Sequence, residues 1–157
     1  MARQILNQAL LQETAANQAF DWSNLYLGFD GRIDREDFWC GALGLVALLL
    51  VVALVASFLP GLVQDFVLGI AYTASLYPIA ALMSKRLQDR NKGTAYLALF
   101  LGLPVFFSIF NLFGPDSRNS LAILLSTLYL PVMLWALIEL CILRGTPGSN
   151  RFGPQPE

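Results

Sequence analysis

The stretch WCGALGLVALLLVVALVASFL, residues 39–59, carries no charged side chain and is apolar at almost every position. About 20 helical residues, at about 1.5 Å per residue, are needed to cross the ~30 Å hydrocarbon core of a bilayer. An open β-strand would leave its edges unpaired in lipid, so this stretch predicts a transmembrane helix.

Three further stretches have the same character and predict spans over about residues 66–84, 95–113 and 119–143. The links between them are short, and the segment KRLQDRNK, Lys85–Lys92, is expected to be the loop between the second and third spans. Short links force neighbouring helices to be antiparallel. The predicted fold is therefore an all-α membrane protein with four transmembrane helices in an up-down bundle.

The composition agrees with this fold class. Of the 157 residues, 56% are hydrophobic and only 13% are charged, whereas about a quarter are charged in an average soluble domain. These proportions exclude an ordinary soluble enzyme and a disordered chain. The net charge of −1 indicates no nucleic-acid partner, and the lack of histidine excludes histidine-based acid–base chemistry and histidine metal sites within these residues.

The orientation follows from the distribution of lysine and arginine. Nine of the ten cations fall on one side of the predicted bundle, and only Arg118 falls on the other. Both termini are thus expected in the cytoplasm, most naturally at a bacterial inner membrane. The first apolar block begins near residue 38, behind an acid-rich segment, which differs from the short basic start of a secretory signal peptide.

The chain divides into three parts on this basis. Residues 1–29 form a cytoplasmic segment, in which 3–19 predict a short amphipathic helix on the membrane surface or else a partly ordered terminus. Residues 30–144 form the four-span membrane domain. Residues 145–157, GTPGSNRFGPQPE, form a cytoplasmic tail too rich in glycine and proline to continue the last helix.

The segment GRIDREDFW, residues 31–39, precedes the first span and allows two interpretations. In the structural one, Asp34 caps the first helix and Asp37, three residues later, resembles the second member of a capping box. In the functional one, Arg32 and Arg35 face an anionic ligand or a lipid headgroup.

The basic segment KRLQDRNK also allows two interpretations. Its four cations act as a topology signal, or they recognise an anionic headgroup as well. Recognition requires arginine forks held in place by acids. Asp89 can supply this by pairing with Arg32, Arg35 or Arg151.

Together, GRIDREDFW, KRLQDRNKGTAY and GTPGSNRFGPQP occur in an order that resembles the bacterial inner-membrane family catalogued as domain of unknown function 805. The resemblance covers about Leu25–Pro156. Members of that family usually carry His where this chain has Gln88, and often Trp where it has Tyr96. The resemblance implies a small multi-span membrane protein and supplies no established activity.

The predicted topology places all three motifs on the same membrane face. We expect a salt-bridge network that closes the cytoplasmic end of the bundle, with headgroup or partner binding added to it. The candidate interfacial charged cluster consists of Arg32, Arg35, Lys85, Arg86, Asp89, Arg90, Asn150 and Arg151. Glu139, the acid inside the last span, is either functional or paired near the interface with Arg144, Lys85 or Arg86.

The sequence shows no motif for a catalytic residue, a cofactor or a metal ion. The first hypothesis is therefore a non-enzymatic membrane module that binds anionic lipid, another membrane protein or a second copy of itself. The second is an oligomeric channel or transporter component, with a polar cavity lined by Asn111, Ser108 and Thr73. The third is a lipid-headgroup enzyme, which requires Asp89, Glu139 or Asp37 to converge beside arginines in a cavity.

Overall fold

The computed structural model describes residues 22–106 and 120–156, with side chains from residue 127 onward in the second range. All regular elements in these residues are helices, and one backbone bridge joins Asn150 to Gly153. The all-α part of the fold prediction is thus confirmed for the described residues. The amphipathic helix predicted over 3–19 lies outside them.

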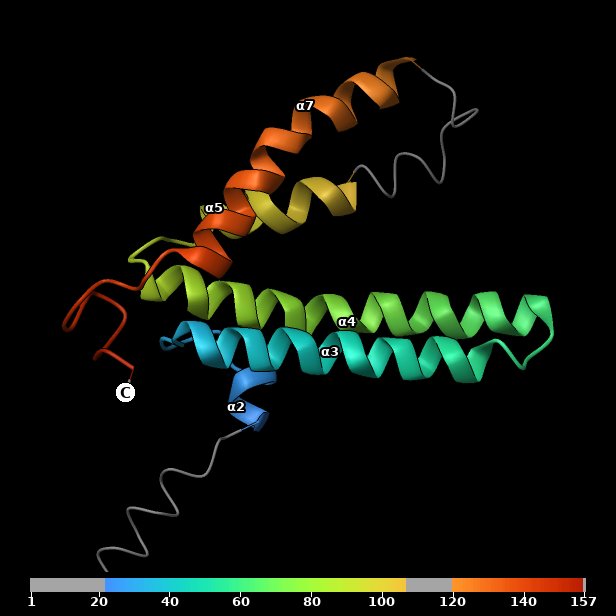
Figure 1. The fold of residues 1–157 in the computed structure, drawn as a ribbon, viewed down its shortest axis with the longest axis horizontal. Coiled ribbons are helices and arrows are strands. Elements are labelled where there is room, and N and C mark those ends of the chain that lie inside the picture. The colour runs from blue at the N-terminus through green and yellow to red at the C-terminus, as the bar shows by residue number, and fades with distance from the viewer. Residues whose placement is uncertain (1–21, 107–119, 157) are drawn as a thin grey trace, which may run out of the picture.

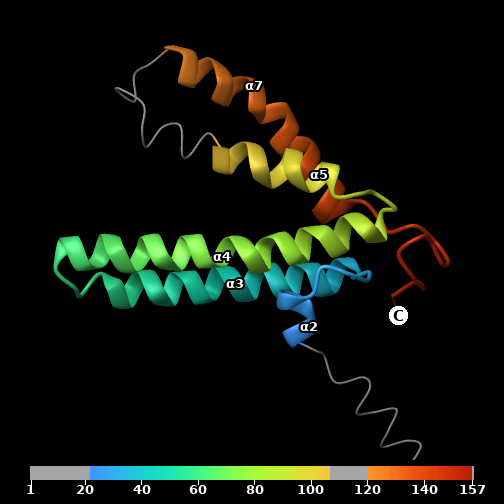
Figure 2. The same ribbon diagram turned by 180° about the vertical axis from the view of Figure 1, so that it is seen from behind.

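Two long antiparallel helices dominate the molecule (Figure 1). Helix α3 spans Arg35–Ala56 and helix α4 spans Gly61–Asp89, while the short helix α2, Trp22–Leu27, crosses near the start of α3 (Figure 2). Because α4 runs to Asp89, the loop predicted over Lys85–Lys92 is wrong for its first five residues, which are helical.

A second pair of helices follows α4. Helix α5, Ala95–Leu97, continues into a π-helical turn, η1, Ala98–Gly102. Helix α7, Ser120–Leu137, likewise continues into the π-helical turn η2, Ile138–Ile142. This pair meets α4 near its C-terminal end and diverges from it in the other direction (Figure 1).

Helix α3 starts where the sequence predicts a cap. The Asp34 carboxylate accepts a hydrogen bond of 2.7 Å from the backbone N–H of Asp37. Glu36 and Asp37 place negative charge in the first turn, where it interacts favourably with the positive end of the helix dipole. The predicted capping role of Asp34 is confirmed.

Helix α4 ends in a Schellman motif. The N–H of Lys92 donates to the carbonyl of Leu87 at 2.8 Å, and the N–H of Asn91 donates to that of Gln88 at 2.9 Å. Asn91 adopts a left-handed conformation with φ of 58°, which asparagine tolerates better than most residues. This motif turns the chain sharply toward α5.

The packing of α2, α3 and α4 depends on a close approach at Gly41. A Cβ atom there would lie 2.7 Å from Leu82 of α4 and 3.1 Å from Leu25 of α2, so a larger residue would push these leucines away. Tyr26 of α2 donates its hydroxyl to the Gly41 carbonyl at 3.0 Å. Burial raises the pKa of Tyr26, and so does the negative charge of Cys40 when its thiol is ionised. The phenol is protonated at neutral pH and can donate.

Side chains are distributed in the opposite way to those of a soluble domain. Apolar residues along the helix pair are largely exposed, among them Leu50 at 66% and Leu62 at 85%, whereas Arg86 is fully buried and Asp89 is 3% exposed. Helices α3 and α4 are long and apolar enough to cross a membrane, and Ala95–Phe106 and Thr127–Ile142 are shorter apolar helices.

Candidate functional site

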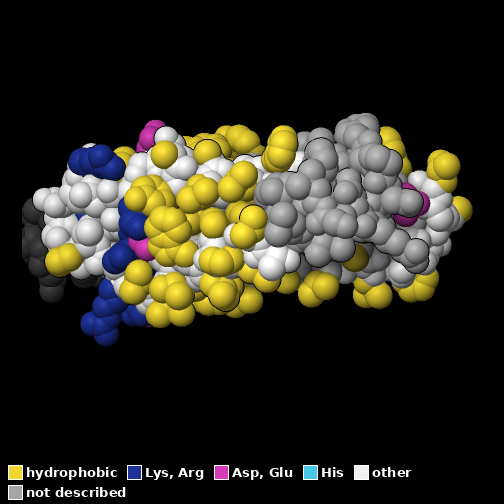
Figure 3. Space-filling model, turned by 90° about the horizontal axis from the view of Figure 1, so that it is seen from above, with side chains coloured by type: hydrophobic (Ala, Val, Ile, Leu, Met, Phe, Trp, Pro, Cys, Tyr) yellow, Lys and Arg dark blue, Asp and Glu magenta, His cyan; other side chains and the backbone are white. Residues whose placement is uncertain are grey.

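Lysine and arginine side chains gather at one end of the molecule, beside a long surface of hydrophobic side chains (Figure 3). The segment before α3, the last turns of α4, the turn η2 and the C-terminal tail all meet there (Figure 1). We call this region the charged end. Its ionic groups include Arg32, Lys85, Arg86, Asp89, Arg90, Lys92 and Glu139.

Asp89 lies at the centre of the charged end, between two arginines. Its Oδ1 atom accepts hydrogen bonds from Arg32 Nη2 at 2.9 Å and Nε at 3.1 Å, and its Oδ2 atom accepts a short one from Arg86 Nη1. The three side chains are 4% exposed or less. Both carboxylate oxygens of this triad are thus paired with guanidinium groups, away from water.

Backbone carbonyls satisfy the remaining donors of the two arginines. Arg32 donates to the carbonyls of Thr146 and Gly148 in the tail, both at 2.7 Å. Arg86 donates to the carbonyl of Leu140 in η2 at 3.0 Å. Two guanidiniums against one carboxylate leave a net positive charge in the triad, and these carbonyl dipoles offset part of it. The triad therefore ties the tail and η2 to α4.

The tail approaches Asp89 more closely than any residue larger than glycine would allow. A Cβ atom at Gly145 would lie only 2.0 Å from Asp89 Oδ2. The next residue, Thr146, donates both its backbone N–H and its hydroxyl to the Asp89 carbonyl, each at 2.9 Å. Gly145 and Thr146 are therefore part of the site.

A second ionic group surrounds Glu139 in η2. Its carboxylate pairs with Arg90 Nε at 2.9 Å and with Lys92 Nζ at 3.1 Å, and we call these three residues the Glu139 cluster. The Lys92 ammonium also lies 4.6 Å from the ring centre of Tyr96 and 5.3 Å from that of Trp135. The side chains of Arg90 and Lys92 are 23% and 22% exposed, so this cluster is more accessible to solvent than the triad.

Two other candidate residues, Lys85 and Asn150, connect backbone segments, and so does Gln88, which was not among the candidates. The Lys85 ammonium donates to the backbone and side-chain oxygens of Asn24 in α2. Gln88 Nε2 donates to the Phe29 carbonyl at 2.8 Å, and Asn150 Nδ2 donates to the Gln88 carbonyl at 2.9 Å. Among the described residues, Gln88 Oε1 is the buried side-chain atom that has no hydrogen-bond partner.

The exposed cations of this end are Arg35, Arg144 and Arg151. Arg35 Nη1 donates to the Ile142 carbonyl at 3.3 Å, and Arg151 Nη2 donates to the Asn91 carbonyl at 3.1 Å. The single contact of Arg35 leaves the rest of its guanidinium free to attract an anion, whereas the Arg151 guanidinium also lies 4.6 Å from the ring centre of Phe152.

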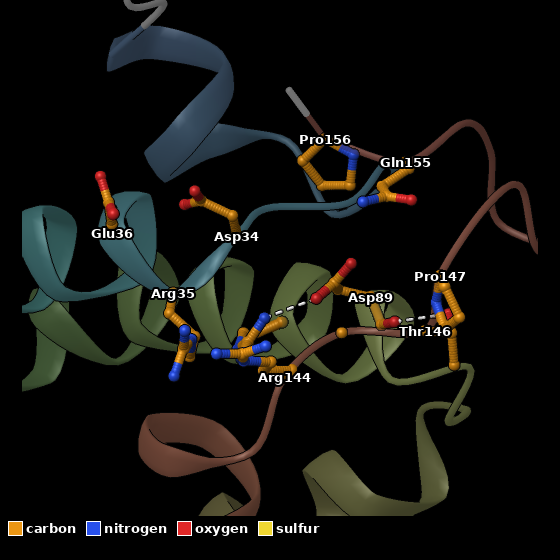
Figure 4. A pocket seen from close by; sticks show the side chains of 11 residues that line it. Asp34, Arg35, Glu36, Asp89, Arg144, Thr146, Pro147, Gln155 and Pro156 are labelled. Carbon is orange, nitrogen blue, oxygen red and sulfur yellow. Dashed lines mark hydrogen bonds and ion pairs between the residues drawn. The ribbon is translucent and has the colours of Figure 1, made fainter.

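Two of these arginines border a polar cavity of about 300 Å³ next to the triad. Arg35 and Glu36 point to opposite sides in Figure 4, and the Asp34 carboxylate is engaged as the cap of α3. Because Asp89 is neutralised by the triad, the cavity offers an anion the guanidiniums of Arg35 and Arg144. The lining includes Asp34, Arg35, Glu36, Arg86, Asp89, Arg144, Gly145, Thr146, Pro147, Gln155 and Pro156.

Comparison with known proteins identifies the family. The profile of the family described as "Protein of unknown function (DUF805)" matches residues 26–154, a range that contains both ionic groups. The chain belongs to the DUF805 family. The resemblance drawn from the three motifs is confirmed.

The DUF805 chain is also similar to proteins named "Inner membrane protein YhaI" from Escherichia coli K12 and from Escherichia coli O157:H7. Each is 25% identical over 133 residues, covering 84% of this chain and 88% of the relative. No solved structure matches.

The three motifs of the DUF805 chain meet in the triad, as the sequence predicts, but with different pairings within the charged end. Of the partners suggested for Asp89, Arg32 takes this role, and Arg86 joins it from the same helix. The partners suggested for Glu139 were wrong, because Arg90 and Lys92 hold it instead of Arg144, Lys85 or Arg86.

Sequence reasoning missed Lys92, Gly145 and Thr146 as members of the site. The sequence pattern presents Lys92 only as a cation of the expected loop, since nothing in the pattern shows that Glu139 pairs with Lys92. The pair Gly145-Thr146 was interpreted as the start of a tail. A glycine directly after an apolar helix is a usual stop signal, so its contact with Asp89 has no separate signature.

The carboxylates at the centre of both ionic groups are paired with cations. Both oxygens of Asp89 and both oxygens of Glu139 are engaged by cations. Within the described residues, no group of three or more His, Cys, Asp or Glu side chains is placed to hold a metal ion. The exposed side chains of Arg35, Glu36 and Arg144 border the polar cavity.

Proposed function

We propose that this chain is a bacterial inner-membrane protein with four spans in up-down order and both termini in the cytoplasm. In this arrangement residues 30–144 form the membrane domain, and 1–29 and 145–157 lie on the cytoplasmic side. The exposed apolar helices and the similarity to a protein named as an inner membrane protein support the location. The cations gathered at one end support the orientation, because cytoplasmic ends of spans are enriched in lysine and arginine.

At its cytoplasmic end the chain acts, in this proposal, as a non-enzymatic module that binds anionic lipid. The observation that carries it is the exposure of Arg35 and Arg144 beside the polar cavity, while the arginines of the triad are fully occupied. Arginine forks bind phosphate oxygens in pairs, and each cation near an anionic leaflet contributes about 1 kcal/mol of attraction.

The sequence leaves open whether the cations of KRLQDRNK act only as a topology signal or also recognise a headgroup, and it offers Arg32 and Arg35 as a second headgroup-binding pair. In the structure Lys85 and Arg86 are buried, and Arg90 and Lys92 neutralise Glu139. Their charges are used inside the protein. We therefore assign the lipid-binding role to Arg35 and Arg144, the two exposed arginines that border the polar cavity.

The two other hypotheses have weaker support. A headgroup enzyme requires Asp89, Glu139 or Asp37 beside arginines in a cavity. Asp89 does line the polar cavity with Arg35 and Arg144, but both of its oxygens are paired with the guanidiniums of the triad. Neither Glu139 nor Asp37 lines that cavity. For a channel, the Thr73 hydroxyl donates to the Gly69 carbonyl of its own helix at 2.7 Å. The other residues of that suggested cavity, Ser108 and Asn111, lie outside the described residues.

The test is to purify the full chain in mild detergent and to identify the retained lipids by mass spectrometry. Anionic phospholipids should be enriched over the composition of the source membrane. Washing with high salt should weaken this enrichment, since the Debye length falls from about 8 Å to about 3 Å between 0.15 M and 1 M salt. Retention of lipids in proportion to the source membrane, or a stoichiometric protein partner without bound lipid, contradicts the proposal.

A further inference from the structure

A second cavity, of about 410 Å³ and lined almost entirely by apolar side chains, lies between the two helix pairs. Met133 and Leu137 of α7 form one wall, and α3 forms another. The α3 residues that line it recur at intervals of three or four and so share one face of the helix. They include Phe38, Ala42, Leu45 and Leu49.

The linings of the apolar and the polar cavity come from neighbouring positions of the chain. Phe38 lines the apolar cavity, and Arg35, one helical turn earlier, lines the polar cavity. Cys141 lines the apolar cavity, and Arg144, three residues later, lines the polar cavity. The hydrogen bond from Arg35 to the Ile142 carbonyl joins these two stretches of the chain. Along α3 and from η2 into the tail, residues that line the apolar cavity are thus within one turn or three residues of the two exposed arginines.

We propose that the two cavities together bind a single phospholipid with an anionic headgroup. Its phosphate lies between Arg35 and Arg144, and one of its acyl chains lies in the apolar cavity between α3 and α7. This inference rests on the proposed lipid-binding function and adds to it a defined site and a defined ligand class.

The division of labour between the cavities follows from the surroundings. An acyl chain that enters the cavity from the bilayer moves from one apolar environment to another. The hydrophobic effect therefore contributes little to its binding, and the apolar cavity selects the chain by its shape. Preference for an anionic headgroup must come from Arg35 and Arg144. Trp39 and Trp135, which are 46% and 40% exposed near this level, are residues typical of the headgroup zone.

The size and charge of the cavities favour a lipid over a helix of another protein. A single helical turn, about 10 Å across and 5.4 Å long, occupies roughly 420 Å³. The apolar cavity of about 410 Å³ therefore has room for about one turn, which is much less than the length of a helix that crosses the membrane. A ligand with one charged end and a narrow apolar tail matches the arrangement better.

Two measurements test this site. In the first, the delipidated protein is titrated with phosphatidylglycerol and with phosphatidylcholine, and bound lipids are counted by native mass spectrometry. The double variant Arg35→Gln/Arg144→Gln should bind phosphatidylglycerol at least tenfold more weakly. The control Arg151→Gln, which removes an exposed arginine of the same end that lines neither cavity, should bind as the wild type does.

The second measurement uses the wild-type chain, so that it does not depend on the folding of a variant. Phosphatidylglycerol with a photoactivatable group in its acyl chain should cross-link to the α3 segment 38–49 and to residues 133–141. Cross-links spread evenly over the apolar surface would overturn the inference. So would an equal loss of binding in the Arg151 variant and in the double variant.

The outcomes separate the inference from the proposed function. If the wild type retains anionic lipid but the double variant binds it equally well, the site is wrong and the function stands. If the wild type shows no preference for phosphatidylglycerol over phosphatidylcholine, both are wrong.

Discussion

At the scale of single residues, the charged end shows how ionic groups can be buried without water. Breaking a buried ion pair by removing one partner is expensive, because the remaining charge has no compensation. Asp89 is the only acid in the triad, and Arg32 and Arg86 both depend on it. The cost of removing its charge should therefore be among the largest for any polar residue described here.

We predict that Asp89→Asn lowers the free energy of unfolding by about 3 kcal/mol or more, because two buried guanidiniums lose their carboxylate. Thermal unfolding in detergent, followed by size-exclusion profiles of heated samples, measures this. Asp65→Asn is the matched control, since Asp65 lies on the same helix, is exposed, and is at the opposite end. Similar losses for both variants would show that the triad contributes no special stability.

Gly145 permits a separate test that leaves every charge in place. We expect Gly145→Ala to destabilise the protein by about 1–3 kcal/mol, because its Cβ would overlap Asp89 Oδ2 and force the tail away. Gly69→Ala is the control, as a Cβ there has open space around it. The same thermal assay applies, and an alanine at Gly145 that unfolds no earlier than the control would contradict the close approach.

At the scale of elements, the sequence predicted the apolar part of α4 well and its polar end badly. The uncharged stretch 66–84 lies inside the observed helix, and the helix continues through Asp89. A search for apolar stretches stops at the first charge, although charged residues also suit helices that pack against protein. Asn91, two residues beyond Asp89, was the available sign of a left-handed helix end.

The turn η2 had no such sign. Its π-helical geometry brings Glu139 to Arg90 and Lys92, and the sequence spacing alone pointed to other partners. Replacing Glu139 by Gln should cost less than Asp89→Asn, because its two cations are partly exposed and can be hydrated. The loss should lie between about 1 kcal/mol, as for exposed pairs, and about 3 kcal/mol, as for buried ones. A larger loss than in Asp89→Asn, in the same thermal assay, would reverse this ranking.

At the scale of the whole molecule, the sequence predicted what composition controls. The uncharged stretches predicted the helical class, and the three motifs predicted the family and included Arg32 among three possible partners of Asp89. The separation of the helices into two pairs, with an apolar cavity between them, could not be predicted. Spans that are apolar nearly all round carry no stripe that marks which face meets protein and which meets lipid.

The distribution of charge over the molecule leads to a prediction of topology. A variant in which Cys40 and Cys141 are replaced by alanine receives one new cysteine at a time, at Phe58, Thr94 or Ser149, all of which are exposed. Phe58 lies between α3 and α4, at the end away from the cations, so Phe58→Cys should react with a membrane-impermeant maleimide in intact spheroplasts. Thr94→Cys and Ser149→Cys lie at the charged end and should react only after lysis. Labelling of Thr94→Cys in intact spheroplasts would place the charged end outside the cell. That result would contradict the orientation expected from the excess of lysine and arginine. It would also contradict a lipid site that faces the anionic cytoplasmic leaflet.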